Sequence, residues 1–585
     1  MTEHYYAITI LNTFTYIYYF YFINKNKRAM SKITIYVLLV LLATHLSIYA
    51  QHQQGDTTTV QVFSFEDPSP EGWGAHYNGR VKFPSSNESW EKILLVKTLK
   101  CDSLTKGDKY PCGEWDYITE TVLYVPKGDT VEPFQIISFI TPYGKRLKLG
   151  DEKGWSWIFD ITDYAPILKG ELDIKSGNNQ ELLDLKFLFI KGIPPRKSIA
   201  VENIYPPRNY KYEFLADDSL LQAKKIVLHK DAEAFMLRAR ISGHGHKGPH
   251  NCCEWDNKTH TYHIGEWNQF RWNVWKDCGF NPIYPQGGTW QFDRAGWCPG
   301  TAVDEYDFEL TPLVFPGDTV SIDYSIEMYR DNGEKDGNFR MSHQLFSYET
   351  PNFNNDAAII DIVTPSSKDE YRRINPICAN PRVIIQNSGK NNLRSLKIIY
   401  GIEDGEKSIY EWTGDLRFLE KEEVWLATPD WGNLTGGEKF IVEIRNTNGV
   451  EDEYENNNYL SSIVMAPLVL PSEFIIHIET NNLDRAKENS YTITNDRGEV
   501  VKSEYNFQDS TTYDYSIKLD SGCYEFRFID KMEDGMIRHW WNRNSAPKNI
   551  CINGKILILD KTGKTELHKL NFDFAQELLL NFRVE

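Results

Sequence analysis

The chain has 585 residues, which is too many for one hydrophobic core and predicts several domains. Its hydrophobic content of 41% and aromatic content of 14% are sufficient for folded domains. The net charge of −18 argues against a nucleic-acid partner, because phosphate binding needs a basic surface.

A candidate export signal lies near the N-terminus. Residues 30–50 combine a basic start at Lys32, an apolar core and a small residue, Ala50, at the cleavage position, which is typical of a signal peptide. The preceding residues 1–29 are then explained by a start codon assigned too far upstream, and an aromatic membrane anchor over 8–23 is the alternative. We therefore expect an exported protein, periplasmic, cell-surface or secreted, with no membrane insertion after cleavage.

The next two segments alternate apolar and polar residues and show almost no helical periodicity. Residues 51–215 contain such runs at 118–125, 134–140 and 183–190, with turn residues between them. The same pattern resumes over residues 216–367. Each segment predicts an antiparallel β-sandwich domain.

The remaining chain also predicts strands. Residues 368–467, with motifs such as Trp412-Thr-Gly-Asp415, resemble the immunoglobulin-like modules of bacterial surface proteins. Residues 468–585 predict a further β-sandwich, with strands near 524–529 and 555–559. The predicted fold class is therefore all-β.

Nine cysteines are compatible with an oxidising compartment. Three pairs flank segments that a disulfide would close: Cys101 and Cys112, Cys278 and Cys298, and Cys523 and Cys551. Cys252, Cys253 and Cys378 have no evident partner in the sequence.

Side chains suited to chemistry are concentrated in three segments. The segment from His244 to Asp256 contains histidines, cysteines, a glutamate and a tryptophan, and residues 293–300 are Asp-Arg-Ala-Gly-Trp-Cys-Pro-Gly. An earlier segment, Cys112-Gly-Glu-Trp-Asp116, repeats the Glu-Trp-Asp of the first. Such a density of reactive groups predicts an active or binding site.

Two carboxylates in these segments are candidate catalytic groups. Asp116 stands at the start of a predicted strand, where sandwich proteins carry functional groups, although a turn-forming aspartate is the alternative. Glu254 adjoins Trp255, and partial burial there would raise its pKa and allow it to donate a proton. Its alternative is an ordinary solvated glutamate.

Arg294 offers a rigid, planar fork for polar groups of a ligand. The alternative is a structural ion pair with Asp293 or another acid.

Three histidines suggest a metal site. His244 and His246 are two residues apart, so on a strand their side chains would face the same way and could bind copper or zinc, with His250, Cys252 or Glu254 completing the set. Gly248-Pro249 interrupts any strand before His250, which argues against this hypothesis.

Taken together, the motifs resemble the peptide-N-glycosidase F family, bacterial amidases that release N-linked glycans from asparagine. The similarity covers roughly residues 56–350. The matching blocks, in the family's order, are Cys112-Gly-Glu-Trp-Asp116, Phe139-Ile-Thr-Pro-Tyr143, Asp160-Ile-Thr-Asp163, Ile241-Ser-Gly243, Cys252-Cys-Glu-Trp255 and residues 293–300. The resemblance implies two packed eight-stranded jelly rolls with the active site in the cleft between them.

The resemblance also implies roles for individual residues. Asp116 matches the aspartate that activates the attacking water, and Glu254 matches the glutamate that contacts the proximal sugars and assists catalysis. Positions in or beside the cleft, with substrate contact or support as their role, are matched by Trp115, Tyr143, His246, Trp255, Arg294 and Trp297. The family uses neither a metal nor another cofactor, so none is expected here. Intact disulfides are implied at Cys101–Cys112 and Cys278–Cys298.

Two positions depart from the family's pattern. Gly177 stands where the family has a third acidic residue, and Asp173 or Glu181 would have to replace it. Around Glu254, Cys252 matches one member of a short family disulfide, but Asp256 stands at the other. A Cys252–Cys253 bridge, free thiols or pairing elsewhere all remain open.

The leading hypothesis is an exported amidase that releases N-glycans whole and converts asparagine to aspartate. Its partners would be N-glycoproteins or glycopeptides, with no nucleic acid, and it would act as a monomer. Because of Gly177, a glycan-binding protein without turnover is the main alternative. A copper monooxygenase, which the His244-Gly-His246 segment suggests, is a third hypothesis.

Overall fold

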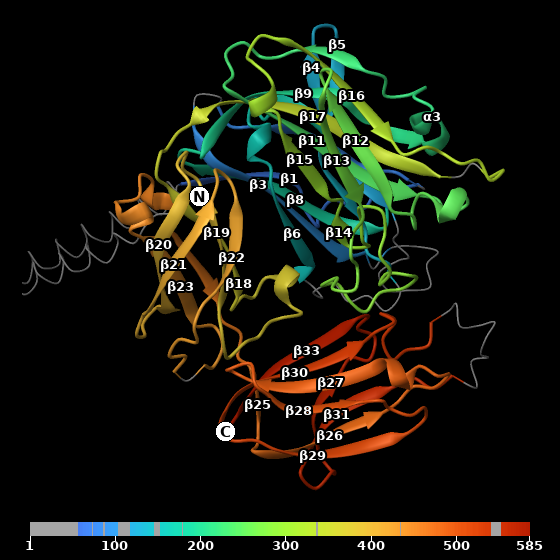
Figure 1. The fold of residues 1–585 in the computed structure, drawn as a ribbon, viewed down its shortest axis with the longest axis vertical. Coiled ribbons are helices and arrows are strands. Elements are labelled where there is room, and N and C mark those ends of the chain that lie inside the picture. The colour runs from blue at the N-terminus through green and yellow to red at the C-terminus, as the bar shows by residue number, and fades with distance from the viewer. Residues whose placement is uncertain are drawn as a thin grey trace, which may run out of the picture. The chain divides into compact units, whose positions relative to one another are not determined.

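The structure is a computed structural model. It describes residues 56–72, 74–85, 88–102, 104, 117–144, 153–177, 179–334, 337–432, 434–539 and 551–585. Nearly all of its regular structure is β-strand, as the sequence predicts, and its eight sheets pack as four successive sandwiches (Figure 1). No helix in these ranges has the length and apolar character needed to cross a membrane.

The first sandwich has the strand order of a jelly roll. Its sheets run β1-β8-β3-β6 and β2-β7-β4-β5, so that each sheet pairs strands from both halves of the segment. A short strand from further along the chain, β14, extends the second sheet beyond β5. The bounds are β1 Thr57–Phe63, β2 Tyr77–Lys82, β3 Trp90–Cys101, β4 Ile118–Lys127, β5 Thr130–Ile140, β6 Trp155–Asp160, the 3-10 turn η2 Thr162–Tyr164, β7 Glu171–Ser176, β8 Glu181–Lys191 and β14 Thr301–Ala302.

Period-two alternation explains these strands. In β8, Leu183, Leu185, Phe187 and Phe189 are fully buried in the core, while the residues between them are partly exposed. The predicted strand at 183–190 is therefore confirmed, as are those at 118–125 and 134–140, which lie within β4 and β5.

The second sandwich repeats the same topology. Its sheets run β15-β11-β17-β9 and β10-β16-β12-β13, which is the order of the first sandwich with the strands renumbered. The bounds are β9 Arg196–Lys211, the helix α3 Tyr212–Ala216, β10 Lys224–Val227, β11 Ala234–His244, η3 Pro249–Asn251, β12 Lys258–Ile264, β13 Asn268–Val274, β15 Glu305–Glu309, η4 Thr311–Leu313, β16 Thr319–Ile326 and β17 Asn338–Pro351. β9 lies before residue 215, the predicted end of the first domain. Its hydrogen bonds to β17 nevertheless make it part of the second sandwich.

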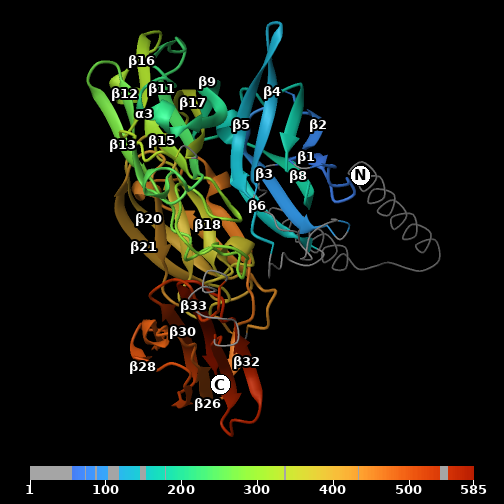
Figure 2. The ribbon, with the colours of Figure 1, turned by 90° about the vertical axis from the view of Figure 1, so that its right-hand side faces the viewer.

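Polar side chains join the two jelly rolls. Arg340 on β17 pairs with Glu120 on β4, which is 5% exposed, and its Nη2 donates to Glu120 Oε2 at 2.5 Å. Gln135 on β5 donates to Glu120 Oε1 at 2.6 Å and accepts from Ser342 at 2.5 Å. Figure 2 shows the blue-to-cyan strands of the first jelly roll beside the green strands of the second. Because these groups satisfy one another away from water, the interface fixes the strands on its two sides against each other.

The third sandwich has seven strands in two sheets, β18-β19-β22 and β21-β20-β23-β24, a number typical of immunoglobulin-like modules. The bounds are β18 Ala357–Thr364, η5 Asp369–Tyr371, β19 Arg382–Asn387, β20 Leu393–Ile402, β21 Ser408–Leu416, β22 Lys421–Trp425, β23 Lys439–Arg445, η6 Thr447–Gly449, η7 Glu455–Asn457 and β24 Tyr459–Ile463. β18 lies before residue 367, the predicted end of the second domain. It pairs with β19 and therefore belongs to the third sandwich.

The fourth sandwich contains the sheets β25-β33-β30-β27-β28 and β29-β26-β31-β32. The bounds are β25 Leu468–Leu470, β26 Glu473–Glu479, η8 Ala486–Glu488, β27 Asn489–Asn495, β28 Val500–Tyr505, β29 Thr512–Lys518, β30 Gly522–Asp530, β31 Lys555–Asp560, β32 Glu566–Leu570 and β33 Glu577–Val584. The suggested Cys523–Cys551 bridge is wrong, because Cys523 bonds Cys378 and thereby links this sandwich to the segment before β19. The two sulfur atoms come from segments 145 residues apart, a pairing that spacing alone does not indicate.

Candidate functional site

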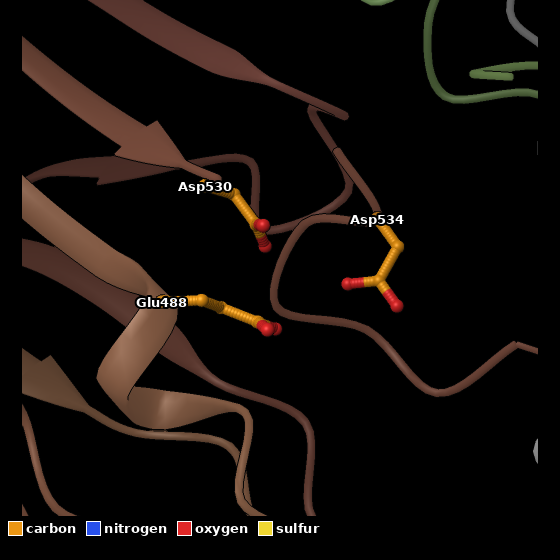
Figure 3. Close-up of side chains that lie close together, drawn as sticks. All are labelled: Glu488, Asp530 and Asp534. Atoms are coloured by element: carbon orange, nitrogen blue, oxygen red, sulfur yellow. The ribbon is translucent and has the colours of Figure 1, made fainter. Parts of the chain in front are cut away.

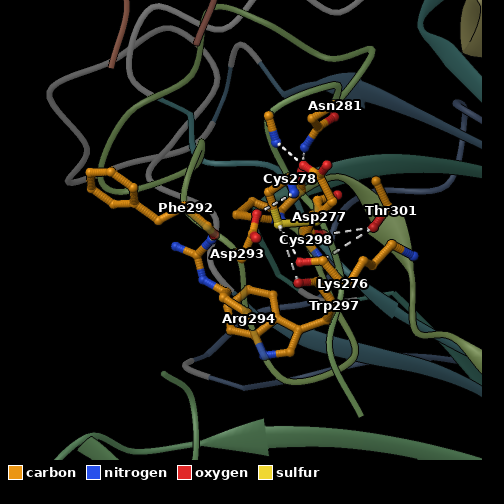
Figure 4. The surroundings of a disulfide bond; sticks show 12 residues. Lys276, Asp277, Cys278, Asn281, Phe292, Asp293, Arg294, Trp297, Cys298 and Thr301 are labelled. Atoms are coloured by element: carbon orange, nitrogen blue, oxygen red, sulfur yellow. Dashed lines mark hydrogen bonds between the residues drawn. A yellow bond between two sulfur atoms is a disulfide. The ribbon is translucent and has the colours of Figure 1, made fainter. Parts of the chain in front are cut away.

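Two loops of the second jelly roll bring four of the predicted site residues together. One loop follows β11 and carries Glu254 and Trp255. The other lies between β13 and β14 and carries Arg294 and Trp297 (Figure 4). The backbone of Ala295 donates to Glu254 O at 3.0 Å and accepts from Gly243 N at 2.9 Å. The segments that the sequence singles out around Glu254 and Arg294 are therefore adjacent.

Two glycines make this close packing possible. A Cβ on Gly243 would lie 1.8 Å from the carbonyl oxygen of Cys253, and one on Gly296 would lie 2.2 Å from that of Ile241. Gly296 also has a φ of +78°, a conformation that favours glycine. The glycines of the Ile-Ser-Gly and Asp-Arg-Ala-Gly segments are thus required by the backbone around the site.

Each loop contains a disulfide. Cys278 and Cys298 are bonded as expected, and Asp293 accepts a hydrogen bond from Cys278 N at 3.0 Å (Figure 4). In the other loop, Cys252 and Cys253 are bonded to each other, which decides between the alternatives that the sequence leaves open. The Cys278–Cys298 bridge limits the freedom of the loop that carries Arg294 and Trp297.

Arg294 is completely buried and is hydrogen-bonded on every nitrogen. Its Nε donates to Glu254 Oε1 at 3.1 Å, its Nη1 to Phe292 O at 2.6 Å, and its Nη2 to Thr289 O at 2.6 Å and Thr289 Oγ1 at 2.8 Å. The planar fork is therefore used within the protein. This geometry favours a role in holding Glu254 over direct contact with a ligand, and the ion pair is with Glu254 rather than with Asp293.

Aromatic rings surround the Arg294 guanidinium. Its central carbon lies 4.4 Å from the ring centroid of Trp255, 4.8 Å from that of Trp297 and 5.8 Å from that of Tyr143. Trp297 is 2% exposed and its Nε1 donates to Gly243 O at 2.8 Å. Tyr143 and Trp297 are thus supporting residues, and Trp255 is the partly exposed member of the three.

Glu254 has the environment of a tuned carboxyl group. Its side chain is 16% exposed, and burial raises its pKa, as expected for its place beside an indole. The charge and hydrogen bond of Arg294 oppose this rise, as does the charge of the exposed His246. The carboxyl group consequently remains partly accessible, is held in one orientation and retains a proton to higher pH than a solvated glutamate.

The second predicted carboxylate, Asp116, lies outside the described residues, as do Trp115 and Cys112. The adjoining Tyr117 is described, and its backbone is held to Thr141, which donates through N to Tyr117 O at 3.0 Å and accepts at Oγ1 from Tyr117 N at 2.9 Å. β4 then begins at Ile118, and its Glu120 is bound to Arg340. The strand that follows Asp116 is therefore attached to the second jelly roll.

Neither Asp173 nor Glu181, the two substitutes that the sequence suggests, lies where it would replace the acidic side chain missing at Gly177. Gly177 has a φ of +64°, and a Cβ there would lie 3.0 Å from the ring of Tyr77. Asp173 is 66% exposed beside Arg80 and stands opposite Tyr124, toward the far end of β4 from Asp116. Glu181 is fully buried inside the first jelly roll, where its charge acts on the buried Lys97.

Several residues that support the site were not identified from the sequence. Gln286 is buried, accepts from Tyr143 N at 2.8 Å and donates to Pro299 O at 3.0 Å. Glu120 and Arg340 bind across the interface between the jelly rolls. An acidic residue within the alternating pattern of β4 is only a weak sign that Glu120 has a structural role. No local pattern indicates that its partner is Arg340.

The histidines do not form the suggested metal site. His244 Nε2 lies 2.8 Å from Ser242 Oγ, and the His244 ring stacks on Trp297 with centroids 5.3 Å apart. Burial and the charges of Arg340 and Arg294 lower its pKa to about 3. His246 and His250 are exposed, and the only cluster of potential metal ligands among the described residues lies elsewhere.

A cavity of about 540 Å³ lies beside the interface between the jelly rolls, but none of the predicted site residues lines it. Several of its charged groups are paired: Arg238 lies 2.7 Å from Asp307 and 3.1 Å from Asp163, and Arg196 lies 3.2 Å from Glu309. We therefore assign these groups a structural role at the interface.

Known proteins share this part of the chain. The family described as peptide-N-glycosidase F, C terminal, matches residues 210–346. The chain is 30% identical over 300 residues to peptide-N(4)-(N-acetyl-beta-D-glucosaminyl)asparagine amidase F of Elizabethkingia miricola, an alignment covering 47% of this chain and 79% of that protein. The solved structure of PNGase F, a glycosylasparaginase from Flavobacterium meningosepticum, aligns at 27% identity and a TM-score of 0.42 over 50% of this chain and 96% of that one. PNGF-II aligns at 18% identity and a TM-score of 0.37 over 53% and 67% of the two chains.

Proposed function

The chain belongs to the peptide-N-glycosidase F family, and we propose that it hydrolyses the amide bond between an N-linked glycan and asparagine. The glycan would leave whole, and the asparagine would become aspartate. The observation that carries this proposal is the assembly around Glu254, which the buried Arg294 orients beside Trp255. The matched relative has an asparagine amidase name, and the two motif segments around Glu254 and Arg294 are adjacent in this chain.

The proposed reaction needs a base, a group that polarises the amide and a sugar-binding surface. We assign activation of water to Asp116 and a hydrogen bond to the proximal sugar and scissile amide to Glu254, whose raised pKa favours the protonated, donating form. Water adds to the amide carbon and the C–N bond breaks, so that the glycan leaves as a glycosylamine. Trp255 would stack on a sugar ring, and His246 would contact the glycan from the exposed side.

Incubation of the chain from Gln51 with a denatured N-glycoprotein in ¹⁸O-labelled water tests the proposal. We expect intact glycans in solution and one ¹⁸O atom in the aspartate at each former glycosylation site. Cleavage within the glycan, or unlabelled asparagine at sites that still carry glycan, would contradict it.

A glycan-binding protein without turnover is the second candidate, and Gly177 is the observation that favours it, because glycine stands where the family has an acidic residue and the suggested substitute Asp173 is exposed to solvent. In that case the immobilised chain would retain N-glycopeptides unchanged. Retention together with ¹⁸O incorporation would instead favour the amidase.

We also propose that the protein works in an oxidising compartment outside the cytoplasm. Three disulfides support this location: Cys252–Cys253, Cys278–Cys298 and Cys378–Cys523. Detection of the chain in the periplasmic, surface and culture-medium fractions would test it, and a purely cytoplasmic chain would overturn it.

A further inference from the structure

Three acidic side chains meet at one end of the fourth sandwich. Glu488 ends η8, Asp530 ends β30, and Asp534 lies in the turn that follows. One carboxylate oxygen of each lies within 4.8 Å of those of the other two. Figure 3 shows the three carboxylates directed toward a common space.

Asp530 provides a second observation that points to a ligand. It is fully buried, and its Oδ1 accepts a hydrogen bond from Met532 N at 2.8 Å. Its Oδ2 is also buried and has no hydrogen-bond partner among the described residues. Burying a carboxylate oxygen without a hydrogen-bond partner costs free energy. Because the Oδ2 atom of Asp530 lies in an acidic cluster, this cost points to a cation as its ligand.

Arg485 is the cation that contacts these carboxyl groups among the residues that the structure describes. Arg485 lies 3.5 Å from Glu488 Oε1 and contacts Asp534, while its Nη1 donates to Ile537 O at 2.9 Å. The nearby Lys487 is paired with Asp484 on the surface. When all three carboxyl groups are ionised, the one guanidinium that contacts them in the described part of the chain leaves two negative charges, which a divalent cation would neutralise.

We propose that Glu488, Asp530 and Asp534 bind a calcium ion. Calcium takes oxygen ligands at about 2.3–2.6 Å, so two oxygens on opposite sides of it lie up to roughly 5 Å apart, which accommodates the observed spacing. Magnesium requires about 2.0–2.1 Å and a tighter octahedron. Glu488 and Asp534 are 13% and 14% exposed, so water can supply the remaining ligands.

The test uses the full chain from Gln51, stripped of metal with EDTA and then dialysed against CaCl₂. We expect one calcium ion per chain and an increase in melting temperature on the order of 5–10 °C when calcium exceeds its Kd a hundredfold. Asp530→Asn and Asp534→Asn should each weaken calcium binding at least tenfold. Asp514→Asn, at a 60% exposed position of the same sandwich, is the matched control and should bind normally.

Absence of stoichiometric calcium in the unmodified chain would overturn the proposal, whatever the variants do. Equal affinity in Asp530→Asn, Asp534→Asn and the unmodified chain would also overturn it, since the ion would then lie elsewhere. Circular dichroism of the calcium-free variants establishes that any loss of binding occurs in a folded chain. The glycan-release assay is a separate readout, because the inference does not rest on amidase activity.

Discussion

At the scale of single residues, Arg294 sets the properties of Glu254 through two linked effects. Its guanidinium opposes the rise in the Glu254 pKa that burial causes, and its hydrogen bond fixes the carboxyl group in one orientation. Its other nitrogens bind Phe292 and Thr289, so the fork that orients Glu254 is itself held rigidly. In the proposed reaction, the buried Arg294 would therefore act on the substrate through Glu254.

Arg294→Lys should separate charge from geometry. Lysine keeps the charge but loses the planar fork, leaving acceptors at Thr289 and Phe292 unmatched, which should lower the free energy of unfolding by roughly 3 kcal/mol. With the Nε hydrogen bond lost, the pKa of Glu254 rises further, so the high-pH limb of kcat/KM should move to higher pH. We expect kcat to fall on the order of 10–100-fold.

A full pH profile measures this change, with Arg271→Lys on the exposed face of β13 as the control. An unchanged profile and unchanged stability would show that Arg294 does not hold Glu254.

At the scale of elements, the site depends on how closely two loops approach and on how two jelly rolls are aligned. Gly243, near the end of β11, lies so close to the carbonyl oxygen of Cys253 that no side chain fits there. Across the interface, the Glu120–Arg340 pair joins β4 to β17.

Gly243→Ala should displace the loop that carries Glu254. Its Cβ would lie 1.8 Å from Cys253 O, so we expect the free energy of unfolding to fall by about 3 kcal/mol or more. Gly405→Ala is the matched control, because its nearest neighbour would be 3.5 Å away, and its cost should stay within about 1 kcal/mol. Equal urea midpoints for the two variants would contradict the close packing.

Glu120→Gln should weaken the attachment of β4 to the second jelly roll. It leaves Arg340, which is 21% exposed, without its carboxylate, so the expected cost is about 3–5 kcal/mol. Glu411→Gln breaks the exposed pair with Lys397 and should cost about 0–1 kcal/mol. If β4 positions Asp116, kcat falls in Glu120→Gln more than KM changes, and an unaltered kcat would refute that link.

At the scale of the whole molecule, the sequence predicts what is local and misses what is distant. Alternation in β4, β5 and β8 is enough to predict strands, and the segment at 293–300 is enough to locate Arg294. Nothing local indicates that β9 pairs with β17, that Glu120 meets Arg340, or that Cys523 meets Cys378. Each of these is a contact between segments more than a hundred residues apart, which periodicity does not report.

The Cys378–Cys523 bond should stabilise the C-terminal half of the chain. It closes a segment of 145 residues, for which the loss of chain entropy in the unfolded state amounts to about 3–5 kcal/mol. Cys378→Ser, Cys523→Ser and the double variant should therefore lose the same stability, since each removes one bond. Additive losses in the double variant, measured by calorimetry, would show that the two sulfur atoms are not partners.

The most direct test of the central claim compares Asp116→Asn with Asp173→Asn in the release of glycan from a denatured N-glycoprotein, followed by mass spectrometry. Both changes remove one carboxylate from the first jelly roll, but Asp173 is exposed and lies toward the far end of β4. We predict that Asp116→Asn abolishes release while Asp173→Asn releases glycan at the rate of the unmodified chain. Undiminished release by Asp116→Asn would contradict the account, because the aspartate assigned to water activation would then not be the catalyst.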